Sequence, residues 1–252
     1  MERADRAAVA TFHVPGAWGP GDVVVLDDAA AHHVAVKRLR DGDPVRLTSG
    51  DGRRALGQLA QVTRRAASVR LEDEGVELVA PLPAVILLAP VGDRERMLML
   101  AEKAAELGVT EWRPVVYRRS RSVTPRGEGA AFRARVRLRM IAALEQSGGA
   151  WLPRLHDELP PGEARAAVDA AGVGTHLLLD AAGAPLAHLL ATARAPLAIA
   201  LGPEGGLEPD ERAGFVDAGW RPASLGPNIL RFETAAIGAL AVARAHLNNP
   251  AA

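Results

Sequence analysis

Two glycine–proline loops in the C-terminal part of the chain carry the residue types best suited to chemistry. The first glycine loop, Leu201–Gly206 (LGPEGG), lies between an apolar run of strand length and a helix expected to begin near Pro209. Glycines let a backbone approach a ligand closely, and the free amides of a helix N-terminus suit a polar or anionic group. A Walker-type phosphate loop is excluded because no Gly-Lys-Ser/Thr ending follows, and the dinucleotide fingerprint is also missing. Alone, this loop is more typical of a tight turn than of a ligand site.

The second glycine loop, Leu225–Thr234 (LGPNILRFET), changes that interpretation. It also lies between a predicted strand and a predicted helix, at the carboxyl end of its strand. Open parallel sheets bind ligands in the crevice outside those strand ends. We therefore expect both loops to form the walls of one pocket, with Glu204, Arg231 and Glu233 as the only charges nearby.

A run of arginines supplies a second candidate function. Nine arginines lie between Arg113 and Arg139, against a single acid, Glu128. Such a local excess of positive charge is what phosphate contacts need, and an almost unopposed run repels itself unless a partner neutralises it. The alternative is a helix face that is simply solvated. We expect RNA contacts from Arg118, Arg119, Arg121 and Arg126.

Composition narrows the class of protein. The chain has 252 residues, 48% of them hydrophobic, and its 30 Lys plus Arg balance its 30 Asp plus Glu. A nucleic-acid surface therefore has to be local, because no field of one sign covers the whole molecule. Cysteine is absent, which excludes disulfides and thiolate metal sites. No apolar run reaches the roughly 18 residues of a membrane span and no signal-peptide pattern starts the chain, so we expect a cytoplasmic protein without a membrane partner.

No metal or hydrolase chemistry is expected. His32 and His33 are adjacent, and adjacent side chains on a helix point apart, so they do not predict a metal site. The Gly-x-Ser-x-Gly elbow of serine hydrolases and the HExxH pattern of zinc proteases are both missing from the sequence.

The N-terminal part has the pattern of a small β-rich domain such as a barrel. Short apolar runs between turn residues predict strands, and Ser49–Gly52 can supply the positive φ angles of a tight hairpin. The acids and prolines of Glu72–Pro83 predict a linker. The expected strands are Asp22–Leu26, Val45–Leu47, Ala55–Val62 and Ser68–Leu71, and the expected helix is Ala30–Arg40.

After this linker, strand-like and helical segments alternate. Asp93 has the position of an N-cap for a helix whose apolar residues share one face and which ends at Gly108. Alternation of this kind predicts an α/β fold, with a parallel sheet covered by helices on both faces. The expected strands are Ala84–Ala89, Val115–Tyr117, Thr175–Leu179, Leu197–Leu201 and Pro222–Leu225.

Four motifs together resemble the RsmE family of 16S ribosomal RNA (uracil-N3)-methyltransferases. They are GPEGG, LGPNILRFETA, the helix AEKAAELGV and the segment EQSGG, and the resemblance spans nearly the whole chain. It implies a PUA-like RNA-binding β-barrel domain over residues 1–74 and a SPOUT methyltransferase domain over residues 75–252. It also implies a deep C-terminal trefoil knot that holds S-adenosylmethionine, a homodimer, and 16S rRNA or the 30S ribosomal subunit as partner. We expect no membrane and no metal among its partners.

The resemblance assigns roles around the two loops. Leu179, Leu225 and Leu230 would hold the adenosine, and Glu204 or Glu233 would accept the N3 proton while Arg231 stabilises the uracil oxygens. The alternative for Arg231 is a helix-start cation paired with one of those two acids. The expected cofactor contacts also include Gly202, Glu204, Gly205, Gly206, Gly226 and Asn228.

Two departures from the family pattern keep other functions open. The family usually has an arginine where this chain has Gly149, and often one where it has Asn228. One alternative is a SPOUT enzyme that methylates ribose 2′-hydroxyls. The other is a non-catalytic protein that binds RNA or assists ribosome assembly.

Overall fold

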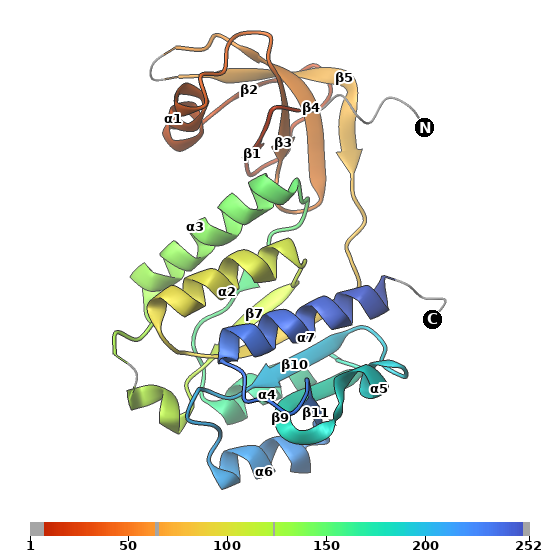
Figure 1. Ribbon diagram of the computed structural model, residues 1–252. Helices are drawn as coiled ribbons and strands as arrows, with labels where there is room; N and C mark the ends of the chain where they lie inside the picture. The colour runs from red at the N-terminus through yellow and green to blue at the C-terminus, as the bar shows by residue number, and fades with distance from the viewer. Residues whose placement is uncertain (1–7, 64–65, 123, 249–252) are drawn as a thin grey trace. The chain divides into compact units, whose positions relative to one another are not determined.

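The computed structural model describes residues 8–63, 66–122 and 124–248, and the chain divides into two compact units (Figure 1). The β-rich unit comprises Met1–Pro81 and Ile141–Leu152, and the sheet unit comprises Leu82–Met140 and Pro153–Ala252. Helix α3 (Ala130–Ser147) therefore gives its first turns to the sheet unit and its last turns to the β-rich unit.

The β-rich unit is built on a five-stranded sheet in the order β1-β3-β4-β5-β2. β1 pairs with β3 in parallel, and the other neighbours pair antiparallel. Alternate residues such as Val45 and Leu47 point into one core with Phe12 and Val69, as the period of a half-buried strand requires. Its elements are β1 (Ala10–His13), β2 (Val23–Val25), α1 (Asp28–Val36), β3 (Pro44–Thr48), β4 (Arg53–Ala60) and β5 (Ser68–Leu78).

The predicted hairpin is confirmed, and the predicted linker is partly wrong. Gly50 and Gly52 adopt φ angles of +81° and +105° between β3 and β4. β5, however, continues to Leu78, because Glu77 pairs with Arg54 of β4 both in register and through an ion pair of 2.7 Å. The residue-74 division expected from the sequence falls within this strand, whereas the two units divide after Pro81.

The EQSGG segment belongs to the β-rich unit. The Thr48 hydroxyl donates to the Gly149 carbonyl at 2.8 Å, and the His13 amide donates to Oε1 of Glu145 at 2.8 Å. Arg54 donates to the carbonyl of Gly148 at 2.8 Å. Hydrogen bonds therefore join this motif to a domain that precedes it by many residues in sequence, which no local pattern indicated.

The sheet unit confirms the predicted parallel α/β fold. Its six strands have the order β11-β9-β10-β6-β7-β8, and every pair is parallel. The strands are β6 (Val85–Pro90), β7 (Glu111–Val115), β8 (Arg154–Leu155), β9 (Thr175–Pro185), β10 (Leu197–Leu201) and β11 (Arg221–Ser224). The helices of this unit, beside the start of α3, are α2 (Arg94–Glu106), η1 (Arg118–Ser122), α4 (Pro161–Asp169), α5 (Leu186–Leu190), α6 (Pro209–Asp217) and α7 (Phe232–Leu247).

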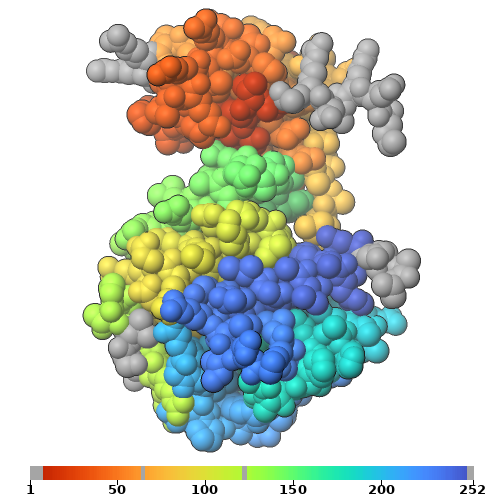
Figure 2. All heavy atoms as spheres, in the orientation of Figure 1, coloured from red at the N-terminus to blue at the C-terminus, as the bar shows by residue number. Residues whose placement is uncertain are grey.

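Helices cover both faces of this sheet. α7 packs against β10, β6 and α2, and its side chains lie beside those of α2 on the face shown in Figure 2. On the other face, Phe215 and Trp220 join Ile86 and Leu88 in one buried cluster. β6 and β10 are buried along their whole length, which explains why their apolar runs are continuous rather than alternating.

Local signals predicted α2 well and β7 poorly. Asp93 accepts hydrogen bonds from the amides of Glu95 and Arg96 at 3.1 Å, so the predicted N-cap is confirmed. The second strand of this unit was expected at Val115–Tyr117, but it is Glu111–Val115. Glu111 and Arg113 interrupt the apolar run from which a buried strand is predicted. No helix in the described part of the chain is long and apolar enough to cross a bilayer.

Candidate functional site

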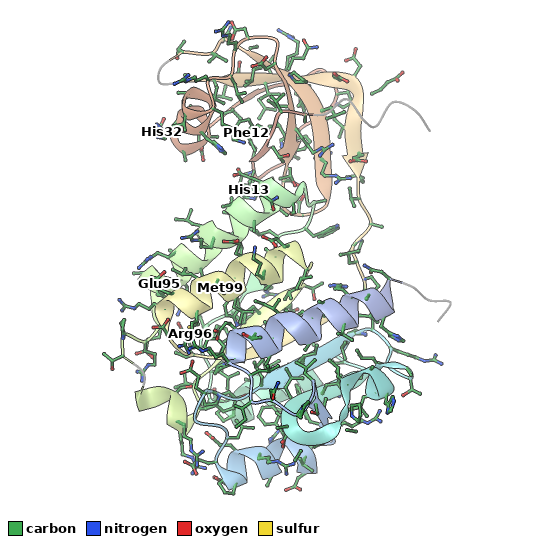
Figure 3. The ribbon with its side chains drawn as sticks, in the orientation of Figure 1. Phe12, His13, His32, Glu95, Arg96 and Met99 are labelled. Carbon is green, nitrogen blue, oxygen red and sulfur yellow. The ribbon has the colours of Figure 1, made fainter. Side chains whose placement is uncertain are left out.

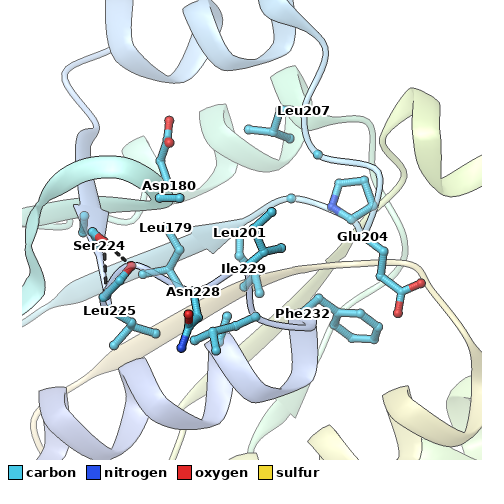
Figure 4. A pocket seen from close by; sticks show the side chains of 18 of the residues that line it. Leu179, Asp180, Leu201, Glu204, Leu207, Ser224, Leu225, Asn228, Ile229 and Phe232 are labelled. Carbon is cyan, nitrogen blue, oxygen red and sulfur yellow. Dashed lines mark hydrogen bonds between the residues drawn. The ribbon is translucent and has the colours of Figure 1, made fainter.

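A pocket of about 350 Å³ lies at the carboxyl ends of β10 and β11, beside the middle of β9 (Figure 4). This volume is within the range of roughly 300–1,000 Å³ that is usual for small-molecule sites. Both glycine loops contribute to its walls, so the predicted pocket is confirmed. Its lining residues are Leu179, Asp180, Ala181, Leu201, Gly202, Pro203, Glu204, Gly206, Leu207, Arg212, Ala223, Ser224, Leu225, Gly226, Asn228, Ile229, Leu230, Phe232 and Ala235.

Sheet topology brings the two loops together. β9 pairs in parallel with β10 on one side and with β11 on the other. Parallel strands end toward the same edge of a sheet. The end of β10 pairs with Leu179 and the end of β11 with Pro185, so the two loops emerge on either side of the second half of β9. The crossover from β10 through α6 to β11 therefore carries the second glycine loop back to the first.

The first glycine loop is a tight turn. The Gly206 amide donates to the Pro203 carbonyl at 2.8 Å, and Gly206 has a φ angle of +76°. A Cβ atom at Gly202 would lie 2.9 Å from Cγ of Leu207, so only glycine lets this wall approach so closely. The side chains of Glu208 and Glu211 then form a capping box that starts α6.

The second glycine loop is open to solvent. Gly226 has a φ angle of +139°, and a Cβ atom there would meet nothing within 4 Å. Its amide donates to the Ser224 hydroxyl at 3.2 Å, as the dashed lines in Figure 4 show. Ile229 is 93% exposed and Leu230 is 40% exposed, although both line the pocket. Exposed aliphatic side chains at a cavity indicate a surface that a ligand or partner covers.

Most of the predicted cofactor residues line this pocket. Gly205 does not: its carbonyl accepts a hydrogen bond from Arg119, which holds it on the outer side of the first glycine loop. Cofactor binding by these residues stays a prediction. Those that line the pocket are Leu179, Gly202, Glu204, Gly206, Leu225, Gly226, Asn228 and Leu230.

The pocket has two charged residues that the sequence did not indicate. Asp180 and Arg212 both line it, and Nε of Arg212 lies 2.6 Å from Oδ2 of Asp180. Burial by itself raises the pKa of Asp180, but the amide of Ala182 and the Arg212 guanidinium outweigh it and hold that pKa below its ordinary value. The expectation that Glu204, Arg231 and Glu233 are the only nearby charges is therefore wrong. The sequence signal that could have indicated Asp180 as a pocket residue is its position directly after a buried apolar run.

The three catalytic candidates lie in different surroundings. Glu204 lines the pocket, and its side chain is 41% exposed. Glu233 is buried in the first turn of α7 and lies outside the lining set, and Arg231 is the exposed N-cap residue of that helix. Arg231 forms no ion pair with either acid within the described residues. The cation that does so is Arg96 of α2, so the pairing considered for Arg231 is wrong.

The arginine run is not unopposed. Arg118 pairs with Asp210 of α6, and Nε of Arg119 lies 2.9 Å from Oε1 of Glu208. Arg126 pairs with the acid inside the run, Glu128, at 2.5 Å. The premise of self-repulsion is therefore wrong for Arg118 and Arg119, because the fold brings acids at the start of α6 to them. The side chain of Arg121 lies outside the described part.

No metal site is present among the described residues, where no group of three or more His, Asp or Glu side chains converges. The chemistry of the pocket rests on aliphatic walls, open glycine backbone and charged groups of both signs. Such a site suits a ligand that combines an apolar ring with hydroxyl and charged groups.

Comparisons with known proteins agree with this geometry. An RNA methyltransferase domain model matches residues 80–244, and an RNA methyltransferase PUA domain model matches residues 26–72. The ribosomal RNA small subunit methyltransferase E of Mycobacterium tuberculosis is 30% identical over 236 residues, which cover 91% of this chain and 88% of that protein.

Two solved structures extend the similarity to the fold. The ribosomal RNA small subunit methyltransferase E of Neisseria gonorrhoeae, bound to S-adenosylmethionine, is 27% identical with a TM-score of 0.77, covering 94% of this chain and 97% of that one. A Legionella pneumophila protein assigned as a methyltransferase, also in complex with S-adenosylmethionine, is 28% identical with a TM-score of 0.78 and covers 93% of this chain and 96% of that one.

Proposed function

Because this chain belongs to the RNA methyltransferase family of the ribosomal RNA small subunit methyltransferase E (RsmE) proteins, we propose that it methylates N3 of a uridine in 16S rRNA with S-adenosylmethionine as methyl donor. The observation that carries this proposal is that both glycine loops line the same pocket, at the ends of the parallel strands β10 and β11. Relatives with the same fold and with this cofactor bound support it.

The pocket fits the cofactor that we propose. Leu179, Leu225 and Leu230 form an apolar wall for the adenine, and the backbone of Gly202 and Gly226 is open to the polar edges of the ligand. The cofactor also carries ribose hydroxyls and a charged amino-acid end. The paired Asp180 and Arg212 offer an acceptor and a donor to such groups, and Gly206 and Asn228 complete the wall.

When bound, S-adenosylmethionine supplies an electrophilic methyl group on a sulfonium. The residues of this chain have to hold the uracil, remove the proton from N3 and stabilise the charge that develops on O2 and O4. Glu204 is the stronger candidate to accept the proton because its carboxylate lines the pocket and is accessible. Glu233 is the alternative, and it would need a rearrangement to reach a substrate. Arg231 is exposed beside the pocket, so its guanidinium is available to the uracil oxygens.

For RNA, we propose contacts from Arg118, Arg119, Arg121 and Arg126 and from the PUA-like β-rich unit. Binding at the first two would exchange their carboxylate partners on α6 for phosphates. The preferred substrate is the 16S rRNA of the 30S subunit, and such a reaction takes place in the cytoplasm.

We also propose the trefoil knot and the homodimer that the family resemblance implies. β11 lies at the edge of the sheet, whereas α7 packs against β10 and β6, so the chain after Ser224 runs back across β9. A return path of this kind is compatible with a threaded C-terminus.

Exposed apolar residues on three helices, Met99, Leu138 and Val242, support an interface with a second copy. Light scattering should give twice the mass of the chain.

The test is methyl transfer from labelled S-adenosylmethionine to 30S subunits and to naked 16S rRNA, followed by mass spectrometry of the nucleosides. We expect N3-methyluridine. A ribose 2′-O-methylated nucleoside would instead support the alternative enzyme. Cofactor binding without any transfer to either RNA would support a non-catalytic assembly protein.

A further inference from the structure

Three segments meet at the mouth of the pocket, and one of them has no role in the function proposed above. They are the start of α2, the first glycine loop and the first turn of α7. A Cβ atom at Gly92, just before α2, would lie 2.9 Å from Cε1 of Phe232, so the backbone there lies directly against α7. Asp93 caps α2 through the Arg96 amide at 3.1 Å, which fixes the point from which the Arg96 side chain extends.

Arg96 contacts acids from both other segments. Its Nη1 forms an ion pair with Oε1 of Glu204, and its Nε lies 4.0 Å from Oε1 of Glu233. Figure 3 labels Arg96 at the end of α2 that is nearest to the start of α7. The side chain of Arg96 is 27% exposed, so the pair is partly shielded from water.

Glu233 needs this cation more than Glu204 does. The Glu233 side chain is only 8% exposed, and its Oε2 has no hydrogen-bond partner among the described residues. A buried carboxylate without a counter-charge is strongly unfavourable. The N-terminus of α7 offsets part of this cost, because Glu233 lies in its first turn. Among the described residues, Arg96 is the basic side chain that lies within ion-pair distance of Glu233.

An arginine suits this position because its planar fork presents several donors to two carboxylates at once. Glu204 belongs to one wall of the pocket, and Phe232 and Ala235, on either side of Glu233, belong to another. We propose that Arg96 is a positioning residue for methyl transfer, in which one guanidinium holds Glu204 at the pocket mouth and neutralises buried Glu233. This inference rests on the proposed function, because it deepens the role of the same pocket.

The test compares R96A, R96K and the control R94A, which removes an exposed arginine two residues away on the same helix. Calorimetry with S-adenosylmethionine and turnover on 30S subunits are measured for each. We expect R96A to weaken cofactor binding at least ten-fold and to lower kcat further, R96K to recover part of both, and R94A to bind the cofactor as the wild type does. Unchanged binding and turnover in R96A would overturn the inference.

A second measurement separates neutralisation of Glu233 from a general effect on folding. Removing the buried charge should raise the melting temperature of R96A, so R96A/E233Q should be more stable than R96A while turnover stays low. A double variant no more stable than R96A would refute the neutralisation. If the wild type failed to bind S-adenosylmethionine, the proposed function would fail and this inference with it. Normal wild-type binding together with an unaffected R96A would refute the inference alone.

Discussion

The two glycine loops that line the pocket are held in very different ways. In the first, Arg96 pairs with Glu204, Arg119 donates to the Gly205 carbonyl, and the Gly206 amide closes a turn at 2.8 Å. In the second, Gly226 bonds only to the nearby Ser224 hydroxyl, and the described residues from Gly226 to Arg231 make no backbone–backbone hydrogen bond to the first loop or to a strand. One wall of the pocket is therefore formed in advance, while the other has most to gain from contact with a ligand.

The exposure of side chains follows the same division. Leu207, next to the first loop, is partly buried, whereas Ile229 in the second is 93% exposed. An apolar side chain that covers nothing in the free protein contributes little to folding stability but much to a surface that closes over a ligand. We therefore infer that the first loop gives the pocket its shape, whereas the second loop closes over the ligand and the substrate.

The largest expected effect comes from the second loop. Arg231→Ala removes an exposed guanidinium that pairs with no acid among the described residues, so kcat should fall by about 10²–10³-fold, the usual loss for a group that stabilises developing negative charge. Cofactor affinity should hardly change. Single-turnover methyl transfer and calorimetry measure the two effects, with Arg135→Ala as the exposed control for cofactor affinity. Lost cofactor affinity with an intact turnover rate would contradict this role.

A backbone substitution in the same loop should have the next largest effect. Gly226→Ala puts a Cβ on a residue with a φ angle of +139°, which costs about 1–3 kcal/mol where the conformation is kept. Stability in urea should fall, or the loop should move and cofactor binding weaken. Gly162→Ala in α4 is the matched control, because its added Cβ meets nothing within 4 Å and no unusual φ is involved. Equal effects of the two substitutions would argue against a strained loop.

The first glycine loop should respond more weakly to the loss of an ion pair at the surface. Arg119→Ala removes an ion pair with Glu208 in which the side chains are 43% and 32% exposed, so its effect on unfolding should be only about 0–1 kcal/mol. The free energy of RNA binding should change by more than the free energy of unfolding does. RNA affinity should also lose part of its salt dependence. A salt titration of RNA binding compares the variant with the wild type. An unchanged salt slope would remove Arg119 from the RNA surface.

The smallest effect concerns Asp180 and is restricted to acid pH. Because the folded-state pKa of Asp180 lies below its ordinary value, its contribution to stability is present above the unfolded-state pKa and is lost as the pH falls through the folded one. Asp180→Asn should therefore be less stable than the wild type near neutral pH, and the difference should shrink below about pH 3.8, the ordinary value. Urea denaturation at several pH values measures this. A difference that persists unchanged into strong acid would point to lost packing.

Part of this organisation could be predicted from the sequence. Continuous apolar runs indicated β6 and β10, and the Asp93 cap and Gly108 indicated α2, because such signals are local. The convergence of the two loops followed from strand ends in a parallel sheet. The roles of Arg96, Asp180 and Arg212 were not predictable, because each depends on a partner brought near by the sheet or by α6. The acids that oppose the arginine run escaped prediction for the same reason.

The most direct test is hydrogen exchange of the backbone amides with and without S-adenosylmethionine. If both loops hold the cofactor and only the first is formed in advance, residues 226–231 should gain strong protection on binding, while the Gly206 amide, already hydrogen-bonded, should change little. Protection confined to some other part of the molecule, or no change in either loop at saturating cofactor, would contradict the account.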